Sequence, residues 1–167
     1  MRTWDDCVAF HGHECGGLTI GYQASLYAIS LLGLTFSEDE QVVCISENDA
    51  CGVDAIQVML GCSLGKGNLK FHLRGKQAFS FYNRANGKSV RLVLKPKPGT
   101  MSKAESFAYY QACTPEEMFE VKETVLPCPE KANLYESVRC AKCGETAGSP
   151  WIRLHHGIPV CLDCLED

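Results

Sequence analysis

Phe10-His11-Gly12-His13-Glu14-Cys15-Gly16-Gly17 is the stretch around which the rest of the chain is organised. It contains three potential metal-binding side chains and directly precedes a long apolar segment. In an extended segment, residues i, i+2 and i+4 point to the same side, so His11, His13 and Cys15 could converge on one ion or substrate. The flanking glycines let the backbone bend closely around whatever is bound there. We therefore expect the rest of the chain to be a scaffold for this cluster, with a separate zinc module at its far end.

The segment after the cluster is predicted to be a helix over 18–34, with Gly33 as its C-terminal cap. No charged residue occurs from Gly16 to Ser37, which is about the length of a membrane span. The run contains several polar side chains, and its hydropathy is weak for a membrane helix. We therefore expect a helix buried in a core or a subunit interface, and no membrane association.

The composition is that of an ordinary globular protein, since hydrophobic residues make up 46% of the 167 residues. This length gives room for one good core and a small appendage. The chain has eleven cysteines, and its N-terminal segment lacks the apolar region of a secretory signal. The cysteines therefore indicate metal or thiol chemistry in a reducing compartment, and we expect a cytoplasmic protein.

The downstream pattern predicts an α+β core in which helices pack on a mainly antiparallel sheet. Further helices are expected over residues 3–9, 52–60, 102–112 and 114–122. Strands are expected over residues 41–46, 69–74, 79–82 and 90–94. The last three should form an antiparallel meander with one apolar and one basic face, and Asn86-Gly87 is a strong hairpin turn within it. The expected domains are a core over 1–126, a linker over 127–138 and a finger over 139–167.

The charge distribution is uneven along the chain. No acidic residue lies between Asp54 and Glu105, although ten of the sixteen basic residues do. This asymmetry favours an anionic small-molecule ligand, or self-complementary docking between subunits. The alternative is a basic strand face that is merely solvated.

Four cysteines near the C-terminus form two CxxC pairs at a spacing typical of zinc sites. They are Cys140, Cys143, Cys161 and Cys164. Four thiolates form a closed, structural tetrahedral zinc site, and a segment this short has too little core to fold without it. The second pair is not followed by glycine, which favours a treble clef whose last ligands enter a helical turn. Acidic residues offset the few basic ones, so nucleic-acid binding is not expected.

Several blocks of the sequence together resemble one family. They are Phe10–Tyr22, Glu47–Gln57, Gly61-Cys62 with Gly65–Asn68, and Phe81–Arg84. Over about residues 1–125 the chain is similar to the FmdE family, named after a component of the molybdenum- or tungsten-dependent formylmethanofuran dehydrogenase. The finger resembles a treble-clef appendage that some members carry. One departure is Gly16, where the family more often has proline.

The resemblance implies an α+β core in a tightly intertwined homodimer. It also implies a core cluster of motif histidines and cysteines with an acidic neighbour. Carried over by position, these are His11, His13, Cys15, Cys51 and Cys62, with Asp54 beside them. His and Cys together suit zinc, iron or nickel, so the identity of this second metal stays open. The alternative is a buried turn whose histidines only make hydrogen bonds.

Two functions from different classes remain open at this point. The first is a metal-binding protein of a formylmethanofuran dehydrogenase-type molybdenum or tungsten system, acting as an accessory subunit, with Cys51 and Asp54 as catalytic candidates. Lys66 and Arg84 are then the candidates for binding an anionic cofactor or substrate. The second is a metal-sensing regulatory protein or interaction adaptor without catalytic activity, in which the finger is the docking surface.

Overall fold

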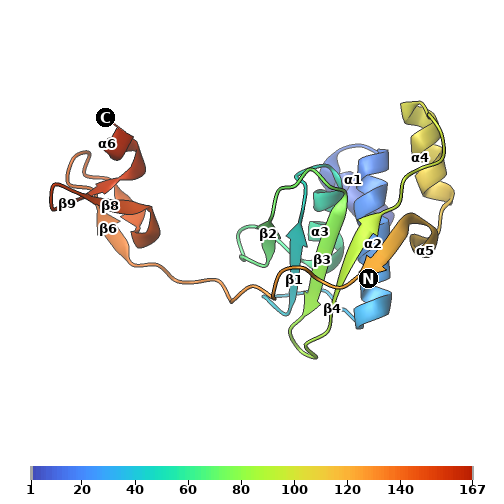
Figure 1. Cartoon of the computed structure of the whole chain (residues 1–167), viewed down its shortest axis with the longest axis horizontal. Helices are drawn as coiled ribbons and strands as arrows, with labels where there is room; N and C mark the ends of the chain where they lie inside the picture. Colours follow the sequence, from blue (N-terminus) through green and yellow to red (C-terminus); the bar gives the residue numbers. More distant parts are fainter. Residues whose placement is uncertain (1, 167) are drawn as a thin grey trace. The chain divides into compact units, whose positions relative to one another are not determined.

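The computed structural model describes residues 2–166, and the chain forms two compact units, residues 1–131 and residues 132–167 (Figure 1). The first unit contains five helices among its described residues: α1 (Trp4–His11), α2 (Gly16–Leu32), α3 (Gly52–Leu60), α4 (Lys103–Ala112) and α5 (Pro115–Met118). Its sheet contains β1 (Val42–Ser46), β2 (Leu69–Phe71), β3 (Ala78–Asn83), β4 (Ser89–Leu94) and β5 (Phe119–Lys122). This is the expected α+β core.

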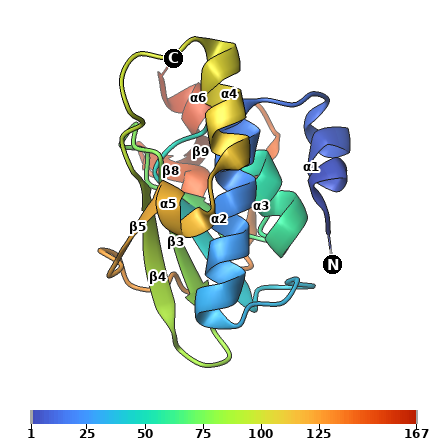
Figure 2. The same cartoon turned by 90° about the vertical axis from the view of Figure 1, so that its right-hand side faces the viewer.

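The long helix α2 lies across one face of the sheet, with α3 beside it (Figure 2). Cys15 caps its N-terminus, because the Leu18 N–H donates to Cys15 Sγ at 3.3 Å. Gly33 ends the helix with a φ of 63°, as predicted. Most residues of α2 are buried or half-buried, and within residues 2–166 no helix is long and apolar enough to cross a membrane.

The helices α2 and α3 meet at a pair of glycines. A Cβ added at Gly21 would lie only 1.9 Å from the Gly52 carbonyl oxygen, so the two backbones approach more closely than any other residue would permit. Next to this contact, a Cβ at Gly17 would lie 3.1 Å from Cys51 Cβ. The glycines thus bring the start of α3 against the start of α2.

The sheet has the strand order β2-β1-β3-β4-β5 and is antiparallel except for one pair. The expected meander is wrong in its first strand: β2 is shorter than predicted and pairs in parallel with β1, with Cys44 opposite Leu69. The connection between β1 and β2 runs through α3, which is the crossover that a parallel pair requires. The hairpin of β3 and β4 forms as predicted, with Phe81 opposite Val90.

The prediction of a helix over 114–122 is only half correct. Thr114 caps α5 with the expected capping box, but the helix ends at Met118 and the chain continues as β5. Phe119 is buried while the following residues are exposed, and Leu94 of β4 lies opposite it. Pairing with β4 and burial of Phe119 therefore override the local helix signal.

The sheet face away from α2 is less basic than its sequence pattern indicates. Arg91 and Glu47 are buried there as a bidentate pair, with Arg91 Nε 2.6 Å from Glu47 Oε1 and Nη2 3.0 Å from Oε2. Tyr82 is buried on the same face, and its hydroxyl donates to the Leu126 carbonyl at 2.7 Å. The hydrogen bond from Arg91, and the burial that opposes it, leave the pKa of Glu47 below its ordinary value.

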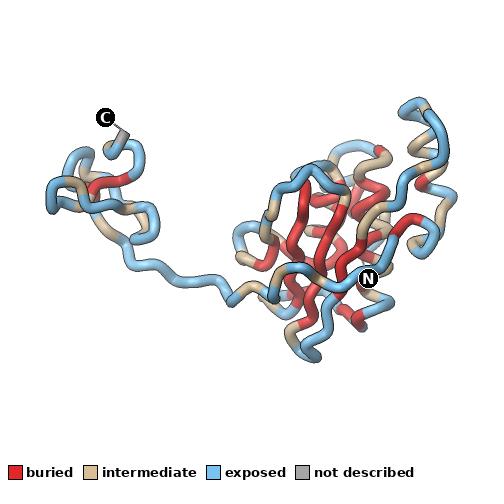
Figure 3. The backbone as a smooth tube through the Cα atoms, in the orientation of Figure 1, coloured by how far each residue is buried: buried red, intermediate tan, exposed pale blue. Residues whose placement is uncertain are grey.

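The second unit contains two short hairpins and a terminal helix. Its elements are β6 (Ser137–Arg139), β7 (Thr146–Gly148), the 3-10 turn η1 (Ser149–Trp151), β8 (Ile152–His155), β9 (Ile158–Cys161) and α6 (Leu162–Glu166). Its buried residues, within the described part of the unit, form one small cluster of Cys140, Val160 and Cys161, whereas the sheet and the helices α2 and α3 of the first unit contain many buried residues (Figure 3). So small a core cannot stabilise the unit without its cysteine site.

Candidate metal centre and its surroundings

The motif at residues 10–17 forms the junction of two helices, and not the extended segment expected from its alternation. His11 is the last residue of α1, Gly12 ends that helix with a φ of 93°, and Cys15 is the N-cap of α2. The chain therefore turns back at His13, which is exposed. The donor atoms of His11, His13 and Cys15 nevertheless all lie within 4.8 Å of one another.

The geometry of this cluster fits a single metal ion. His11 Nε2 lies 3.8 Å from Cys15 Sγ, and the His11 and His13 ring centroids are 4.5 Å apart. Two ligands of a tetrahedral zinc ion are separated by about 3.3–3.8 Å, given metal–ligand distances of about 2.0–2.3 Å. Cys15 is buried and His13 is exposed, so the donors form a cup that opens toward solvent. Three donors leave a fourth position for another ligand.

Asp54, on the first turn of α3, holds His11 in place. Its Oδ2 lies 2.7 Å from His11 Nδ1, and its Oδ1 accepts from Gln57 Nε2 at 3.3 Å. A carboxylate can only accept, so His11 Nδ1 carries the proton and Nε2 is directed at Cys15. This carboxylate–histidine arrangement is the usual support of a metal-bound imidazole. Asp54 is therefore placed to position a ligand.

Cys51 lies beside Cys15 at the start of α3. A Cβ at Gly17 would lie 3.5 Å from Cys51 Sγ and 3.8 Å from Cys15 Sγ. Burial, followed by the hydrogen bond to Cys15, raises the pKa of the Cys51 thiol. A helix start by itself lowers the pKa of a thiol, but desolvation and the neighbouring thiol outweigh that effect here. Cys51 therefore borders the cup as a neutral thiol.

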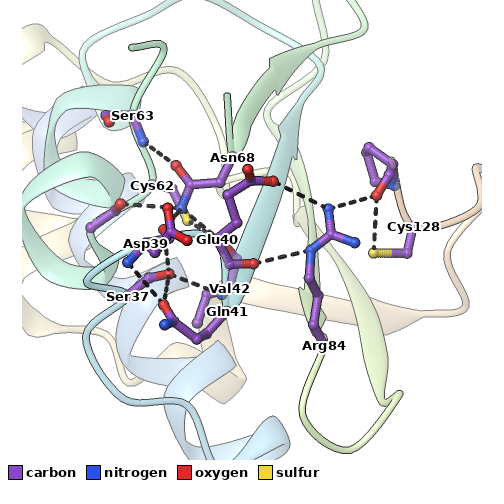
Figure 4. A network of polar contacts seen from close by, with 12 residues as sticks. Ser37, Asp39, Glu40, Gln41, Val42, Cys62, Ser63, Asn68, Arg84 and Cys128 are labelled. Atoms are coloured by element: carbon purple, nitrogen blue, oxygen red, sulfur yellow. Dashed lines mark hydrogen bonds and ion pairs between the residues drawn. The ribbon is translucent and has the colours of Figure 1, made fainter. Parts of the chain in front are cut away.

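Cys62 lies apart from the cluster, although the family resemblance included it. Its thiol is fully buried and lies 3.6 Å from the Val42 carbonyl oxygen (Figure 4). Burial raises the pKa of this thiol to about 12. The neighbouring Asn68 donates to the carbonyls of Asp39, Val42 and Gly61 at 2.9–3.2 Å. This block of the sequence therefore ties the loop after α3 to the start of β1.

Lys66 and Arg84, the candidates for anion binding, also belong to this polar network. Lys66 Nζ donates to the Ser37 carbonyl at 2.6 Å. Arg84 Nε donates to the Glu40 carbonyl at 3.0 Å, and its Nη2 donates to the Pro129 carbonyl at 2.7 Å (Figure 4). The structure thus places both side chains on backbone carbonyls.

The four finger cysteines converge as their spacing predicts. Their sulfur atoms lie within 4.8 Å of one another, and Cys143 Sγ is 3.9 Å from Cys161 Sγ. Backbone N–H groups of Cys143 and Cys161 lower the pKa of Cys140 to about 6, whereas the hydrogen bond with Cys161 raises the pKa of Cys164 to about 12. The separations fit a four-thiolate zinc site, in which sulfur atoms lie about 3.8 Å apart.

Two hollows flank the core cluster, and one of them contains two lysines that were not singled out from the sequence. The first, of about 390 Å³, contains Asp49, Cys51 and Asp54. The second, also of about 390 Å³, lies between His13, Cys15 and the start of α4 and contains Lys97 and Lys103. The only sequence signal for these lysines was the acid-free stretch from 55 to 104, which did not distinguish them from eight other basic residues.

Comparison with known proteins finds a family model and a solved structure that match this chain. The family model described as "FmdE, Molybdenum formylmethanofuran dehydrogenase operon" matches residues 10–138. The crystal structure of an FmdE-like protein of the tungsten formylmethanofuran dehydrogenase type, from Syntrophus aciditrophicus, is similar, with 26% identity and a TM-score of 0.73. The similarity covers 96% of this chain and 89% of that one, so it includes both units.

A curated relative comes from Archaeoglobus fulgidus and is described as a probable S-adenosyl-L-methionine-binding protein. It is 29% identical over 93% of this chain, but the chain spans only 50% of the relative's length.

Proposed function

The chain belongs to the FmdE family, and on that premise we propose that its larger unit binds a divalent transition-metal ion in an open site, as an accessory protein of a formylmethanofuran dehydrogenase-type molybdenum or tungsten system. The observation that carries the metal site is the convergence of the His11, His13 and Cys15 donors within 4.8 Å, with Asp54 bonded to the far nitrogen of His11. The link to the molybdenum or tungsten system is supported by the family description alone.

The residues of the cup define what such a site does. His11, His13 and Cys15 hold the ion, and Asp54 keeps His11 in the tautomer that ligates through Nε2. When bound, an ion with an open position supplies Lewis-acid chemistry to a ligand that enters it. The mixed histidine and cysteine donors suit zinc, iron or nickel. Cys51, at the edge of the cup, is the thiol placed to meet such a ligand or to complete the coordination.

The second unit is proposed to be a treble-clef-type finger with structural zinc. Its support is the closed set of four thiols and the helix α6, which begins between Cys161 and Cys164, as a treble clef requires. With all four positions filled by the protein, no position is left for substrate. The ion here maintains the fold of residues 132–167.

Metal analysis of purified protein tests both sites. We expect two ions per chain in the wild type, and loss of one ion in His13→Ala and of a different one in Cys143→Ser. His72→Ala, which changes a histidine outside both clusters, is the matched control and should keep two ions. A wild-type protein with one ion per chain, unchanged by His13→Ala, would overturn the proposal for the core.

An intertwined homodimer in the cytoplasm is the proposed state of the protein. It is supported by exposed apolar side chains of the larger unit, among them Phe10 and Leu64, which are 59% and 64% exposed. Light scattering after size-exclusion chromatography gives the mass directly. A monomer at micromolar concentration would contradict the homodimer without bearing on the metal site.

A metal-sensing adaptor is the second candidate function. The exposed apolar residues of the finger favour it, since Trp151 is 51% exposed and Leu154 is 77% exposed. This function predicts partner binding that changes with the metal content of the core, without turnover. A partner bound equally well by wild type and His13→Ala would contradict it.

A further inference from the structure

The hollow on the α4 side of the metal cup is lined by potential metal ligands on one side and by lysines on the other. Two metal-binding side chains, His13 and Cys15, form one wall. The opposite wall comes from the segment before α4 and from α4 itself, and it contains Lys97, Lys103 and Tyr110. A volume of about 390 Å³ lies within the range of small-molecule sites. A molecule in this hollow would touch both the lysines and the open face of the cup.

The charge of this hollow is positive and that of its neighbour on the other side of the cup is negative. Its lining, all of which lies in the described part of the chain, includes Lys97 and Lys103 and no carboxylate. The hollow on the α3 side contains Asp49 and Asp54 instead. A ligand that approaches the ion as an anion is therefore attracted to the α4 side and repelled from the α3 side.

Acidic residues near the lysines are engaged elsewhere. Glu14 Oε1 accepts a hydrogen bond from Trp4 Nε1 at 3.2 Å. Glu105 Oε2 accepts one from the Ser102 N–H at 2.8 Å, as part of the capping box of α4. Neither carboxylate is among the residues that line the hollow.

The wall that contains the lysines is fixed to the rest of the core. Lys97 Nζ is hydrogen-bonded to Ser106 Oγ, which joins the segment before α4 to the helix. Gln111 Nε2 donates to Thr19 Oγ1 of α2 at 3.0 Å. A Cβ at Gly16 would lie 3.4 Å from Tyr110, so the glycine lets α4 lie close against the start of α2. The two walls therefore keep their separation.

The position of Lys103 is not explained by helix stability. It is the first residue of α4, where the backbone dipole favours acidic side chains and disfavours a cation. Lys103 therefore lowers the stability of α4 slightly, which fits a role for this side chain outside the helix.

We propose that this hollow binds a small anionic molecule whose carboxylate or phosphate is held by Lys97 and Lys103 while its other end reaches the open position of the core metal. This inference rests on the proposed metal site and names the class of ligand that the site takes. It also replaces Lys66 and Arg84 as the anion-binding residues, because those side chains donate to backbone carbonyls and line neither hollow beside the cup. The lysine ammonium groups act as point charges and accept either kind of anion.

The test is calorimetric titration of the zinc-loaded full-length protein at low ionic strength, where the charge effect is largest. Two probes, inorganic phosphate and succinate, distinguish a phosphate-binding site from a carboxylate-binding one. The hollow variant is Lys97→Gln with Lys103→Gln. The control variant, Lys88→Gln with Lys131→Gln, removes the same charge from exposed residues outside the hollow. Metal content and thermal unfolding are recorded for every variant.

We expect the hollow variant to weaken binding of the preferred probe by about tenfold or more, since two charge-assisted contacts are lost. The control should stay within about twofold of wild type, and both variants should keep two ions per chain. If the double variant unfolds, Lys103→Gln alone is used, because removing a cation from the first turn of α4 does not destabilise that helix.

Equal affinity in the hollow and control variants would overturn the inference, and so would a wild type that binds neither probe. These results are distinct from failure of the metal site. A wild type with a single ion per chain would remove the proposed function, while the effect of the lysines on anion binding would still be measured. The variant His13→Ala is a third test. Its affinity for the preferred probe should fall, because the proposed ligand reaches the core ion.

Discussion

The two cysteine-containing centres of this protein are assembled in opposite ways. In the finger, all four donors belong to two CxxC pairs separated by three short strands, and the described residues contain little other core. In the larger unit, the donors sit where α1 meets α2, and their partners Cys51 and Asp54 arrive on α3. The finger has little core beyond its four thiols, so we expect it to fold around an ion, whereas the core is folded by its apolar residues and presents three donors as a cup. Under the proposed function, metal would stabilise structure in one centre and be available to a ligand in the other.

The largest expected effect comes from breaking the finger. Cys143→Ser removes one of four thiolates and should release the zinc and unfold residues 132–167, because structural zinc supplies about 10–16 kcal/mol of binding free energy in such units. Metal content and backbone amide spectra measure both effects, and the core signals should not change. Cys128→Ser, at an exposed cysteine outside both clusters, is the control. Stoichiometric zinc retained by Cys143→Ser would show that the finger does not depend on all four ligands.

The next effect comes from separating the helices that assemble the cup. Gly21→Ala places a methyl group against the Gly52 carbonyl and should lower the free energy of unfolding of the core by about 3 kcal/mol or more. The core should also lose its ion while the finger keeps its own. Gly65→Ala is the matched control, since a Cβ there meets nothing within 4 Å. Denaturant unfolding and metal analysis would contradict the argument if the two variants behaved alike.

A smaller effect is expected from the residue that orients His11. Asp54→Asn should lower the metal affinity of the core by about 10- to 100-fold and leave the fold intact, because it removes the charge behind the metal-bound imidazole. Competition with a chromophoric chelator measures this affinity. Asp49→Asn takes the same charge from the same hollow without touching the hydrogen bond to His11, and it should change the affinity far less. Equal losses of metal affinity in the two variants would mean that Asp54 acts only through its negative charge in the hollow, and not through its hydrogen bond to His11.

The smallest effect is a dependence of core stability on pH that involves neither ion. Arg91 holds the pKa of Glu47 below its ordinary value, so this pair contributes stability above the unfolded-state pKa of about 4.3. That contribution is lost as the pH falls through the lower folded-state pKa. Little change from this pair is therefore expected between pH 7 and about 4.5.

Denaturant midpoints of wild type and Glu47→Gln measured across this range isolate the contribution of the pair. The difference between the two proteins should be constant at neutral pH and shrink in strong acid. A difference that shrinks already near pH 6 would contradict the lowered pKa.

Local patterns in the sequence determined several features before any packing was known. The caps at Gly33 and Thr114 and the hairpin between β3 and β4 are confirmed, since each is encoded within a short stretch of chain. The convergence of the four finger cysteines is confirmed as well, because the spacing of the two CxxC pairs indicates it. The cluster of His11, His13 and Cys15 was also found, because its three donors lie within five residues. The shape of this cluster was not predicted, because the alternate positions of its donors could not reveal that the motif joins two helices.

Only the tertiary structure decided which distant side chains join that cluster. It brought Asp54 to His11, left Cys62 in the core, and placed Lys66 and Arg84 on backbone carbonyls. It also turned residues 119–122 from a predicted helix into a strand. The physical reason is that capping and ligand spacing act over a few residues, whereas strand pairing, burial and the meeting of α2 with α3 at Gly21 and Gly52 depend on contacts between residues far apart in the chain.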